Sequence, residues 1–333
     1  MLWDGIARRA FGLGGGGGEA VVQALGEREN RGRPKLGLAL GGGAARGWSH
    51  IGVLQVLHRE GFVPDVIAGC SIGAVVGGCY AAGKLDELEA FALSLTKRRV
   101  MGLLDIHLSG SGLIGGERVK RLLETDLGET RIESLPLRFA AIATELGTGH
   151  EIWLTRGPLV EAMRASYALP GIFDPVKVSG RWMMDGALVN PIPITAARAL
   201  GAEIVLCVNL NGDLRVRGTV IQSIGTDEDE VIEAVMEEPR RWGLFGRTAP
   251  RAPKAPGAPG IATVMVDAFN ITQDRIARAR LAGDPPDMMV SPKLATMGLF
   301  EFHRAKECIA LGRQAAERAL PDLHEMLAAS QAA

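Results

Sequence analysis

The chain has 333 residues, of which 47% are hydrophobic and 23% charged. That length suits one large domain or two ordinary ones, and the composition excludes a wholly disordered protein. Thirty-seven basic and 38 acidic residues give a formal charge of -1, which provides no positive field for nucleic acid, so no nucleic-acid partner is expected. The cysteines form neither a CxxC pair nor a disulfide framework, which favours a reducing, cytoplasmic compartment. The histidines lack ligand spacing, so no metal is predicted, and no cofactor is expected.

Short aliphatic runs alternate with helical runs from residue 35 onward. Strands are predicted at 36–40, up to about 68, at 139–144, 151–155, 181–184, 204–209 and 288–290. Helices are predicted from about 51, at 72–82, 117–127, 159–168, 194–200, 261–281 and 301–320. Alternating strands and helices at this spacing imply a mainly parallel central sheet with helices on both faces. The predicted fold class is therefore α/β, in three layers, α/β/α.

Two segments interrupt this pattern and divide the chain. Residues 1–33 begin with apolar side chains at helical spacing, followed by a glycine run at 14–18, which predicts a flexible segment with an interfacial helix. Residues 212–260 turn from acidic to basic and are rich in proline and alanine, which predicts a mobile insertion. The α/β domain is then expected at 34–211, and residues 261–333 are expected to form helices that pack on it.

Membrane contact is considered at three places. The uncharged run 66–83 is long enough to span a bilayer, but its glycines and β-branched start predict a strand, a turn and a small-residue helix instead. Apolar and basic side chains near the N-terminus, and again at 240–247, suit peripheral contact with an anionic surface. The alternative for both of these segments is a flexible tail and a linker without membrane contact.

The strongest local motif is G-x-S-x-G, which runs from Gly69 to Gly73 around Ser71. It follows a predicted strand directly and precedes a predicted helix. Glycine at the flanking positions lets the strand and the helix approach closely, and the helix N-terminus supplies N–H groups to a developing oxyanion. The motif predicts that Ser71 is a nucleophile. The alternative is a turn serine that caps a helix.

A glycine-rich loop at 41–47 reads Gly-Gly-Gly-Ala-Ala-Arg-Gly and also lies between a strand and a helix. Its small residues expose N–H groups that can bind an anion, and Arg46 adds a positive charge. The loop suits either a phosphate or the oxyanion of a reaction at Ser71. The Walker pattern is absent and G-x-G-x-x-G fits poorly, because Arg46 occupies the opening. A purely structural turn remains the third interpretation.

Asp185 is the third candidate. It ends a predicted strand and begins an Asp-Gly turn. An acid at a strand end of an open α/β sheet lies where such sheets bind ligands. Asp-Gly is also an ordinary turn dipeptide, so this motif is weak by itself.

The three motifs, in this order and at these separations, resemble the signature blocks of the bacterial patatin-like phospholipases. The segment 165–173, Ala-Ser-Tyr-Ala-Leu-Pro-Gly-Ile-Phe, is also similar to the family's segment before the aspartate. The resemblance extends over about residues 36–210. It implies a patatin-like fold and a serine hydrolase that cleaves acyl esters of lipids, such as phospholipids or lysophospholipids, through an acyl-serine intermediate. A lipid acyl ester would be the substrate of an enzyme that is cytoplasmic, with peripheral contact at the inner face of the membrane.

The resemblance also implies roles for single residues. Ser71 would be the nucleophile and Asp185 the base of a Ser-Asp dyad, with Gly69 and Gly73 shaping the turn. The oxyanion hole would comprise Gly42, Gly43, Ala44 and Arg46. Position 44 is glycine in the family pattern, and the alanine here keeps its N–H but restricts φ. A free aspartate, with a pKa of ~3.9, is a poor base for a serine hydroxyl, so the site must desolvate it or stabilise the oxyanion strongly.

Several alternatives stay open from the sequence. Chain order permits a triad with His303 or His324, although both lie among charged residues at helical positions. A non-catalytic regulatory member of the same fold, which binds a lipid or protein, is the alternative function, and a phosphate- or nucleotide-binding module is the third. Apolar residues that would line a lipid groove, but would serve equally in a core, are Leu103, Leu104, Ile106, Leu113, Ile114, Ile172 and Phe173.

Overall fold

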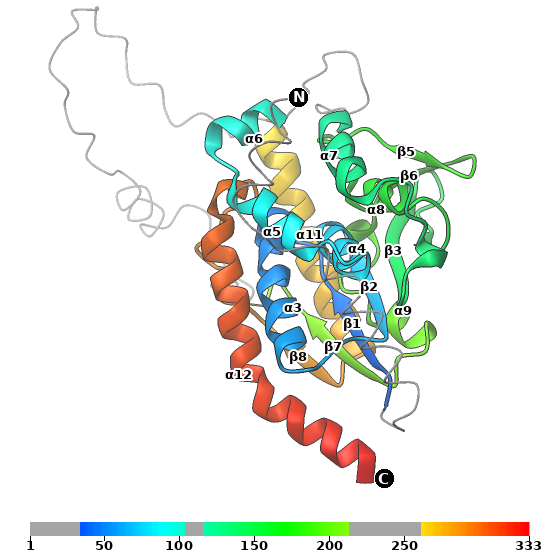
Figure 1. The fold of residues 1–333 in the computed structure, drawn as a ribbon. Helices are drawn as coiled ribbons and strands as arrows, with labels where there is room; N and C mark the ends of the chain where they lie inside the picture. The colour runs from blue at the N-terminus through cyan, green and yellow to red at the C-terminus, as the bar shows by residue number, and fades with distance from the viewer. Residues whose placement is uncertain (1–33, 104–115, 213–260, 333) are drawn as a thin grey trace, which may run out of the picture.

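The computed structural model describes residues 34–103, 116–212 and 261–332 (Figure 1). The predicted N-terminal segment 1–33 and all but the first residue of the predicted insertion 212–260 lie outside the described residues, and so do both segments considered for peripheral membrane contact.

An eight-stranded sheet forms the centre of the described structure, in the order β5-β6-β3-β2-β1-β7-β8 with β4 paired to β3. The parallel strands are β1 (Leu36–Leu40), β2 (Val66–Cys70), β3 (Arg138–Glu145), β7 (Ile204–Val208) and β8 (Met288–Val290). The antiparallel strands are β4 (Glu151–Leu154), β5 (Val176–Val178) and β6 (Arg181–Asp185). The three-layer α/β prediction is confirmed, with a parallel centre and an antiparallel edge.

Helices cover both faces of the sheet (Figure 1). One face carries α3 (Ser49–Arg59), α4 (Ile72–Ala81), α5 (Leu85–Leu93), α7 (Glu117–Leu127), α8 (Leu159–Tyr167) and α12 (Ala305–Ala332). The other carries α9 (Ile194–Ala199) and α11 (Ile261–Gly283). Short 3-10 turns occur at η1 (Ala44–Trp48), η2 (Ile132–Ser134), η3 (Gly186–Leu188) and η4 (Phe302–Arg304).

The structure has two hydrophobic cores, one on each face of the sheet, and the side chains of β1 alternate between them. Leu36, Leu38 and Leu40 are fully buried in the larger core, with α3, α4, α8 and α12. Ala39 faces the opposite way, into the smaller core with α9 and Ala277 of α11. Because side chains of a strand alternate between its faces, β1 is buried on both sides, as expected for the centre of a parallel sheet.

The uncharged run 66–83 divides as predicted, into β2, a turn and α4, and every residue of both elements is buried. Among the described residues there is no helix whose length and apolar character suffice to cross a bilayer.

The C-terminal helix α12 runs beside α3 along one flank (Figure 1). The two backbones touch at glycines: a Cβ on Gly52 would lie 2.1 Å from the carbonyl oxygen of Ile309, and one on Gly312 would lie 2.0 Å from that of Ser49. Only glycine permits this approach. It places α12 against the first turn of α3, directly after the glycine loop.

Candidate active site

Ser71 occupies a strained turn between β2 and α4. Its φ of 55° and ψ of -123° lie where non-glycine residues are rare. A Cβ on Gly69 would lie 2.5 Å from the carbonyl oxygen of Gly73, and one on Gly73 would lie 2.2 Å from that of Leu40. Glycine is therefore required at both positions, and the surrounding backbone holds Ser71 in a conformation that costs about 1–3 kcal/mol.

The side chain of Ser71 contacts Asp185 and does not cap the helix. Its Oγ donates a hydrogen bond of 2.7 Å to Oδ2 of Asp185, and no side-chain cap bond is made at the start of α4. Ser71 is 8% exposed and Asp185 is 2% exposed. The hydroxyl and the carboxylate therefore meet at a nearly buried point next to the N-terminus of α4.

Strand register explains how residues so far apart in sequence meet. In the sheet, β3 lies between β2 and β6, with Cys70 opposite Ile142 and Asp185 opposite Ala143. The strand β6 runs antiparallel to β3 and ends at Asp185, opposite Ala143. Asp185 therefore lies beside the end of β2, where Ser71 follows Cys70. A Cβ on Gly186 would lie 2.2 Å from the carbonyl oxygen of Ile142, so the chain can turn there only at a glycine.

Burial changes the proton affinity of Asp185. Desolvation raises the pKa of this carboxyl from 3.8 to about 7, against the opposing effects of hydrogen bonds from the Ala187 N–H and the Ser71 hydroxyl. The Ala187 bond to Oδ1 is 2.8 Å long. A carboxylate with this pKa is a far better proton acceptor near neutral pH than a solvated aspartate.

Three further residues hold this pair, and sequence reasoning did not single them out. Ser166, which is fully buried, accepts the backbone N–H of Ser71 through its Oγ at 2.8 Å. Thr144 donates its hydroxyl to the carbonyl oxygen of Asp185 at 2.9 Å, and the Asp185 N–H donates to Ala168 at 2.9 Å. Ser166 and Ala168 both belong to segment 165–173, which was the one available signal.

The glycine loop lies against Ser71, since a Cβ on Gly42 would be 3.5 Å from the Cβ of Ser71. Its N–H groups are not equivalent. The N–H of Gly42 donates to the carbonyl of Pro191 at 3.0 Å, whereas those of Gly43 and Ala44 donate to no described residue. Ala44 has a φ of 47°, in the left-handed region that glycine tolerates and that strains a residue with a Cβ.

Contacts from the C-terminal part of the chain hold the other end of this loop. Arg46 donates through Nε to the carbonyl of Met297 at 3.0 Å and through Nη1 to Asn211 at 3.3 Å. The N–H of Ala45 donates to the carbonyl of Leu299 at 2.9 Å. Burial lowers the pKa of Arg46 from its ordinary value. The Arg46 side chain is thus engaged with backbone and amide oxygens of neighbouring segments.

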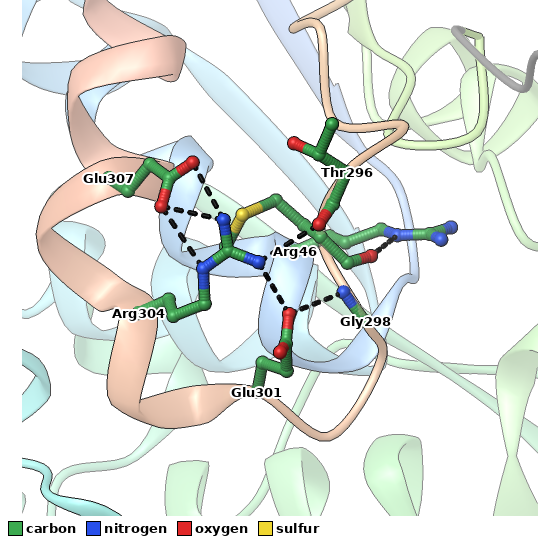
Figure 2. Close-up of polar contacts among 7 residues, drawn as sticks. Arg46, Thr296, Gly298, Glu301, Arg304 and Glu307 are labelled. Atoms are coloured by element: carbon green, nitrogen blue, oxygen red, sulfur yellow. Dashed lines mark hydrogen bonds and ion pairs between the residues drawn. The ribbon is translucent and has the colours of Figure 1, made fainter. Parts of the chain in front are cut away.

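The segment 296–299 is itself held by an ion-pair network, which Figure 2 shows. Arg304 donates to the carbonyl of Thr296 at 2.9 Å, to Glu301 at 2.7 Å and to Glu307 at 2.8 Å. Glu301 also accepts the Gly298 N–H at 2.9 Å, and this bond is the main reason that the pKa of Glu301 is lowered. A continuous set of contacts therefore runs from α12 through segment 296–299 to the glycine loop.

The histidines proposed for a triad lie elsewhere. His324 packs its ring on Phe62 at 4.7 Å between centroids, and His303 lies in η4. Within the described parts of the chain, no histidine contacts the Ser71 hydroxyl or the Asp185 carboxylate, and no group of three or more potential metal ligands occurs. Of the apolar residues considered for a lipid groove, Leu103, Ile172 and Phe173 are half-buried and the other four lie outside the described residues.

Together, the fold and the site define a class of protein: a three-layer α/β protein in which a serine on a strained strand-to-helix turn is hydrogen-bonded directly to a buried aspartate. Residues 38–198 match the family described as "Patatin-like phospholipase". NTE family proteins of Mycobacterium tuberculosis and Mycobacterium bovis, each named as uncharacterised, are 36% identical to the chain over 329 residues, which covers 86% of this chain and 91% of theirs. The chain therefore belongs to the patatin-like phospholipase family.

More distant relatives match only in part. Lysophospholipase NTE1 of Saccharomyces cerevisiae is 31% identical over 183 residues, which covers 53% of this chain and 11% of that protein. Lysophospholipase NTE1 of Yarrowia lipolytica is 28% identical over 220 residues, which covers 64% of this chain and 15% of that protein. Among solved structures, VipD from Legionella pneumophila aligns with a TM-score of 0.44 and 12% identity, over 87% of this chain and 67% of that chain.

Proposed function

We propose that this protein is a serine hydrolase that cleaves carboxylic acyl esters of lipids through a dyad, with Ser71 as nucleophile and Asp185 as base. The observation that carries the proposal is the 2.7 Å hydrogen bond from Ser71 Oγ to Asp185 Oδ2, made on a strained turn. Membership of a phospholipase family, and relatives named lysophospholipases, support a lipid ester as the substrate.

The first half of the reaction forms an acyl-enzyme. The Ser71 hydroxyl transfers its proton to Oδ2 of Asp185 as Oγ bonds to the ester carbonyl carbon, and the carbonyl oxygen becomes an oxyanion. The N–H groups of Gly43 and Ala44, which have no acceptor among the described residues, stabilise that charge together with the positive end of α4. When the tetrahedral intermediate collapses, the bond to the leaving alcohol breaks, and the alcohol oxygen takes the proton from Asp185.

The second half releases the acyl group. Asp185 accepts a proton from water as the water oxygen attacks the acyl-serine carbonyl, and the same N–H groups stabilise the second oxyanion. Collapse breaks the bond to Ser71 Oγ, which recovers the proton, and a fatty acid leaves. The raised pKa of Asp185 matters in both halves, because the residue must accept and return a proton near neutral pH.

This proposal assigns fewer residues as direct oxyanion donors than the sequence suggested. The N–H of Gly42 is already bonded to Pro191, and Arg46 is bonded to Met297 and Asn211. We therefore assign Gly43 and Ala44 as the two direct donors, whereas Gly42 and Arg46 stabilise the conformation of the loop.

The test is labelling with a fluorophosphonate, followed by intact-mass analysis. Wild type should gain one adduct, whereas Ser71→Ala and Asp185→Asn should gain none while keeping the wild-type circular dichroism spectrum. Ser94→Ala is the matched control, because Ser94 is an exposed serine at the end of α5, and it should be labelled as wild type is. Absence of an adduct on folded wild type would favour the non-catalytic regulatory alternative, and an adduct that persists in Ser71→Ala would exclude Ser71 as the labelled nucleophile.

The substrate class is tested separately, with unlabelled protein from a preparation that forms the fluorophosphonate adduct. We expect lysophospholipids and phospholipids to be hydrolysed with release of fatty acid, and expect no such release by Ser71→Ala. A protein that reacts with the fluorophosphonate but releases no fatty acid from either lipid would retain the serine chemistry and lose the lipid assignment.

A further inference from the structure

His50 is a buried residue that the chemistry proposed above does not use. It lies in the first turn of α3 and is 0% exposed. Its Nε2 lies 2.8 Å from the carbonyl oxygen of Gly41, whereas its Nδ1 is buried and has no hydrogen-bond partner in the described part of the chain. An unsatisfied buried nitrogen costs free energy, so the presence of an imidazole here calls for an explanation.

The protonation state follows from the partner. A carbonyl oxygen only accepts hydrogen bonds, so Nε2 carries a proton. Burial lowers the pKa of His50 to about 4, so the ring is neutral near pH 7 and Nδ1 is the unprotonated nitrogen. His50 is therefore a neutral donor aimed at one backbone carbonyl.

That carbonyl belongs to the peptide from which the glycine loop departs. Gly41 donates its own N–H to the carbonyl of Val208 at 3.2 Å, and the next N–H, of Gly42, donates to Pro191 at 3.0 Å. The bond from His50 thus completes the restraint of the Gly41–Gly42 peptide plane on both of its polar atoms. The next N–H along the chain, that of Gly43, is the first in this loop that has no acceptor among the described residues.

The same carbonyl also lies against the serine turn. A Cβ on Gly73 would be 2.9 Å from the Gly41 oxygen, so this oxygen is packed between His50 and the start of α4. Without a donor from His50, rotation of the Gly41–Gly42 peptide would move the N–H groups that follow it relative to Ser71.

We propose that His50 is a positioning residue of the oxyanion hole: its Nε2–H holds the Gly41 carbonyl and thereby orients the N–H groups of Gly43 and Ala44 toward the reacting carbonyl. The inference rests on the proposed function and deepens it. His50 touches no reacting atom. Its contribution is realised only when an oxyanion forms, so it affects the transition state more than substrate binding.

Three substitutions separate positioning from packing. His50→Gln places an amide Nε2 donor within reach of Gly41, and His50→Leu removes the donor but keeps an apolar side chain. Val53→Ala, at a fully buried position one turn later in the same helix, is the matched control for a general packing defect. Where His50→Leu fails to fold, His50→Asn, whose amide is too short to reach Gly41, takes its place.

In steady-state hydrolysis, His50→Leu should lower kcat about 10- to 100-fold and leave KM within about twofold, since loss of one oxyanion donor costs about 100- to 1000-fold and a misplaced donor costs part of that. The inhibition constant of a trifluoromethyl ketone should rise by the same factor, because its adduct with Ser71 carries an oxyanion. His50→Gln should recover most of both losses. Equal losses in His50→Leu, His50→Gln and Val53→Ala would overturn the proposal.

Hydrogen exchange tests the same inference without any substrate. The amides of Gly41 and Gly42 should exchange faster in His50→Leu than in wild type, and at the wild-type rate in His50→Gln. Unchanged exchange in His50→Leu would overturn the positioning role even in an active enzyme. A wild type that forms no adduct with a fluorophosphonate would instead overturn the proposed function, and the exchange result would still stand by itself.

Discussion

Ser166 ties the backbone of Ser71 to the sheet: its Oγ accepts the Ser71 N–H at 2.8 Å and donates to the carbonyl of Ile142 at 2.6 Å. Both bonds are buried, so the hydroxyl satisfies two backbone groups that water does not reach. It also holds Ser71 in its strained conformation from the side of β3. A single hydroxyl therefore connects the candidate nucleophile to the strand that lies between Ser71 and Asp185.

Ser166→Ala is expected to reduce both stability and activity. It leaves the Ser71 N–H and the Ile142 carbonyl unpaired, at a cost of about 2–3 kcal/mol, and it allows Ser71 to shift, which should lower kcat about 10- to 100-fold. Chemical denaturation and steady-state hydrolysis measure the two effects. Ser94→Ala removes an exposed hydroxyl that also donates to a carbonyl and should change stability by less than about 0.5 kcal/mol. Wild-type kcat in Ser166→Ala would show that Ser71 needs no support from this side.

The pH dependence of hydrolysis should report Asp185. The carboxyl must be ionised to accept the Ser71 proton, and burial raises its pKa to about 7. We therefore expect kcat/KM to fall about tenfold per pH unit below pH 7 and to level off above it. A plateau that extends down to about pH 4 would mean that the base is a solvated carboxylate or another group.

One helix was predicted with its limits correct, and glycines mark both of its ends. The helix predicted at 117–127 coincides with α7, which lies between Gly116 and Gly128, both at positive φ. Helices α5 and α6 (Lys97–Leu103) were missed, because each is short and carries charged residues among its apolar ones. The last helix was predicted from 301 to 320, whereas η4 occupies 302–304 and α12 continues past Pro321 to Ala332.

For the site, too, the sequence predicted the residues in local motifs and missed those that act through contacts distant in sequence. Ser71 and Asp185 were found because each lies in a local motif at a strand end. His50, Ser166 and Arg304 were not, since each acts through a backbone group in another segment of the chain. Such contacts depend on strand order and helix crossing, which residue patterns do not encode locally. Whether the Gly42 N–H can bind an oxyanion is likewise decided by its hydrogen bond to Pro191, which lies far along the chain.

The network in Figure 2 predicts that Arg304 affects catalysis through the glycine loop, because it supports the segment 296–299 that Arg46 contacts. Arg304→Gln removes the ion pairs to Glu301 and Glu307 that support segment 296–299. Because the pairs are partly exposed, stability should change by less than about 1 kcal/mol, while looser support of the Arg46 contact should lower kcat about two- to tenfold. Hydrolysis and thermal melts provide the measurements.

Arg59→Gln is the matched control for Arg304→Gln. Arg59, at the end of α3, forms two exposed ion pairs as well, with Glu60 at 3.0 Å and with Glu317 of α12 at 3.5 Å. Neither pair involves segment 296–299 or the glycine loop. We expect wild-type kcat from this variant. Equal kcat values for the two variants would remove the proposed coupling between segment 296–299 and the loop.

Burial of Asp185 should also make stability depend on pH. Its pKa in the folded state, about 7, is higher than the value of 3.8 for a free group, so the folded state binds the proton more tightly. The free energy of unfolding should therefore decrease as pH rises from about 4 to about 7, and stay level above that, by on the order of 4 kcal/mol at most. Asp185→Asn should lack this decrease. Urea denaturation of both proteins at pH 5 and pH 8 isolates the contribution, and an equal change in the two would mean that Asp185 is ionised throughout.

Ala44 offers a test of backbone strain in the loop. Its φ of 47° costs roughly 1–2 kcal/mol for a residue with a Cβ, whereas glycine there would lose about 0.4–1 kcal/mol through the greater freedom of the unfolded chain. Ala44→Gly should therefore raise stability slightly and keep kcat within about threefold, since the N–H donor remains. Ala45→Gly, at the next position of η1 and without a positive φ, should lower stability by about 0.5–1 kcal/mol. Thermal melts and hydrolysis assays on the two variants give the comparison, and a loss of stability in Ala44→Gly as large as that in Ala45→Gly would show that Ala44 is not strained.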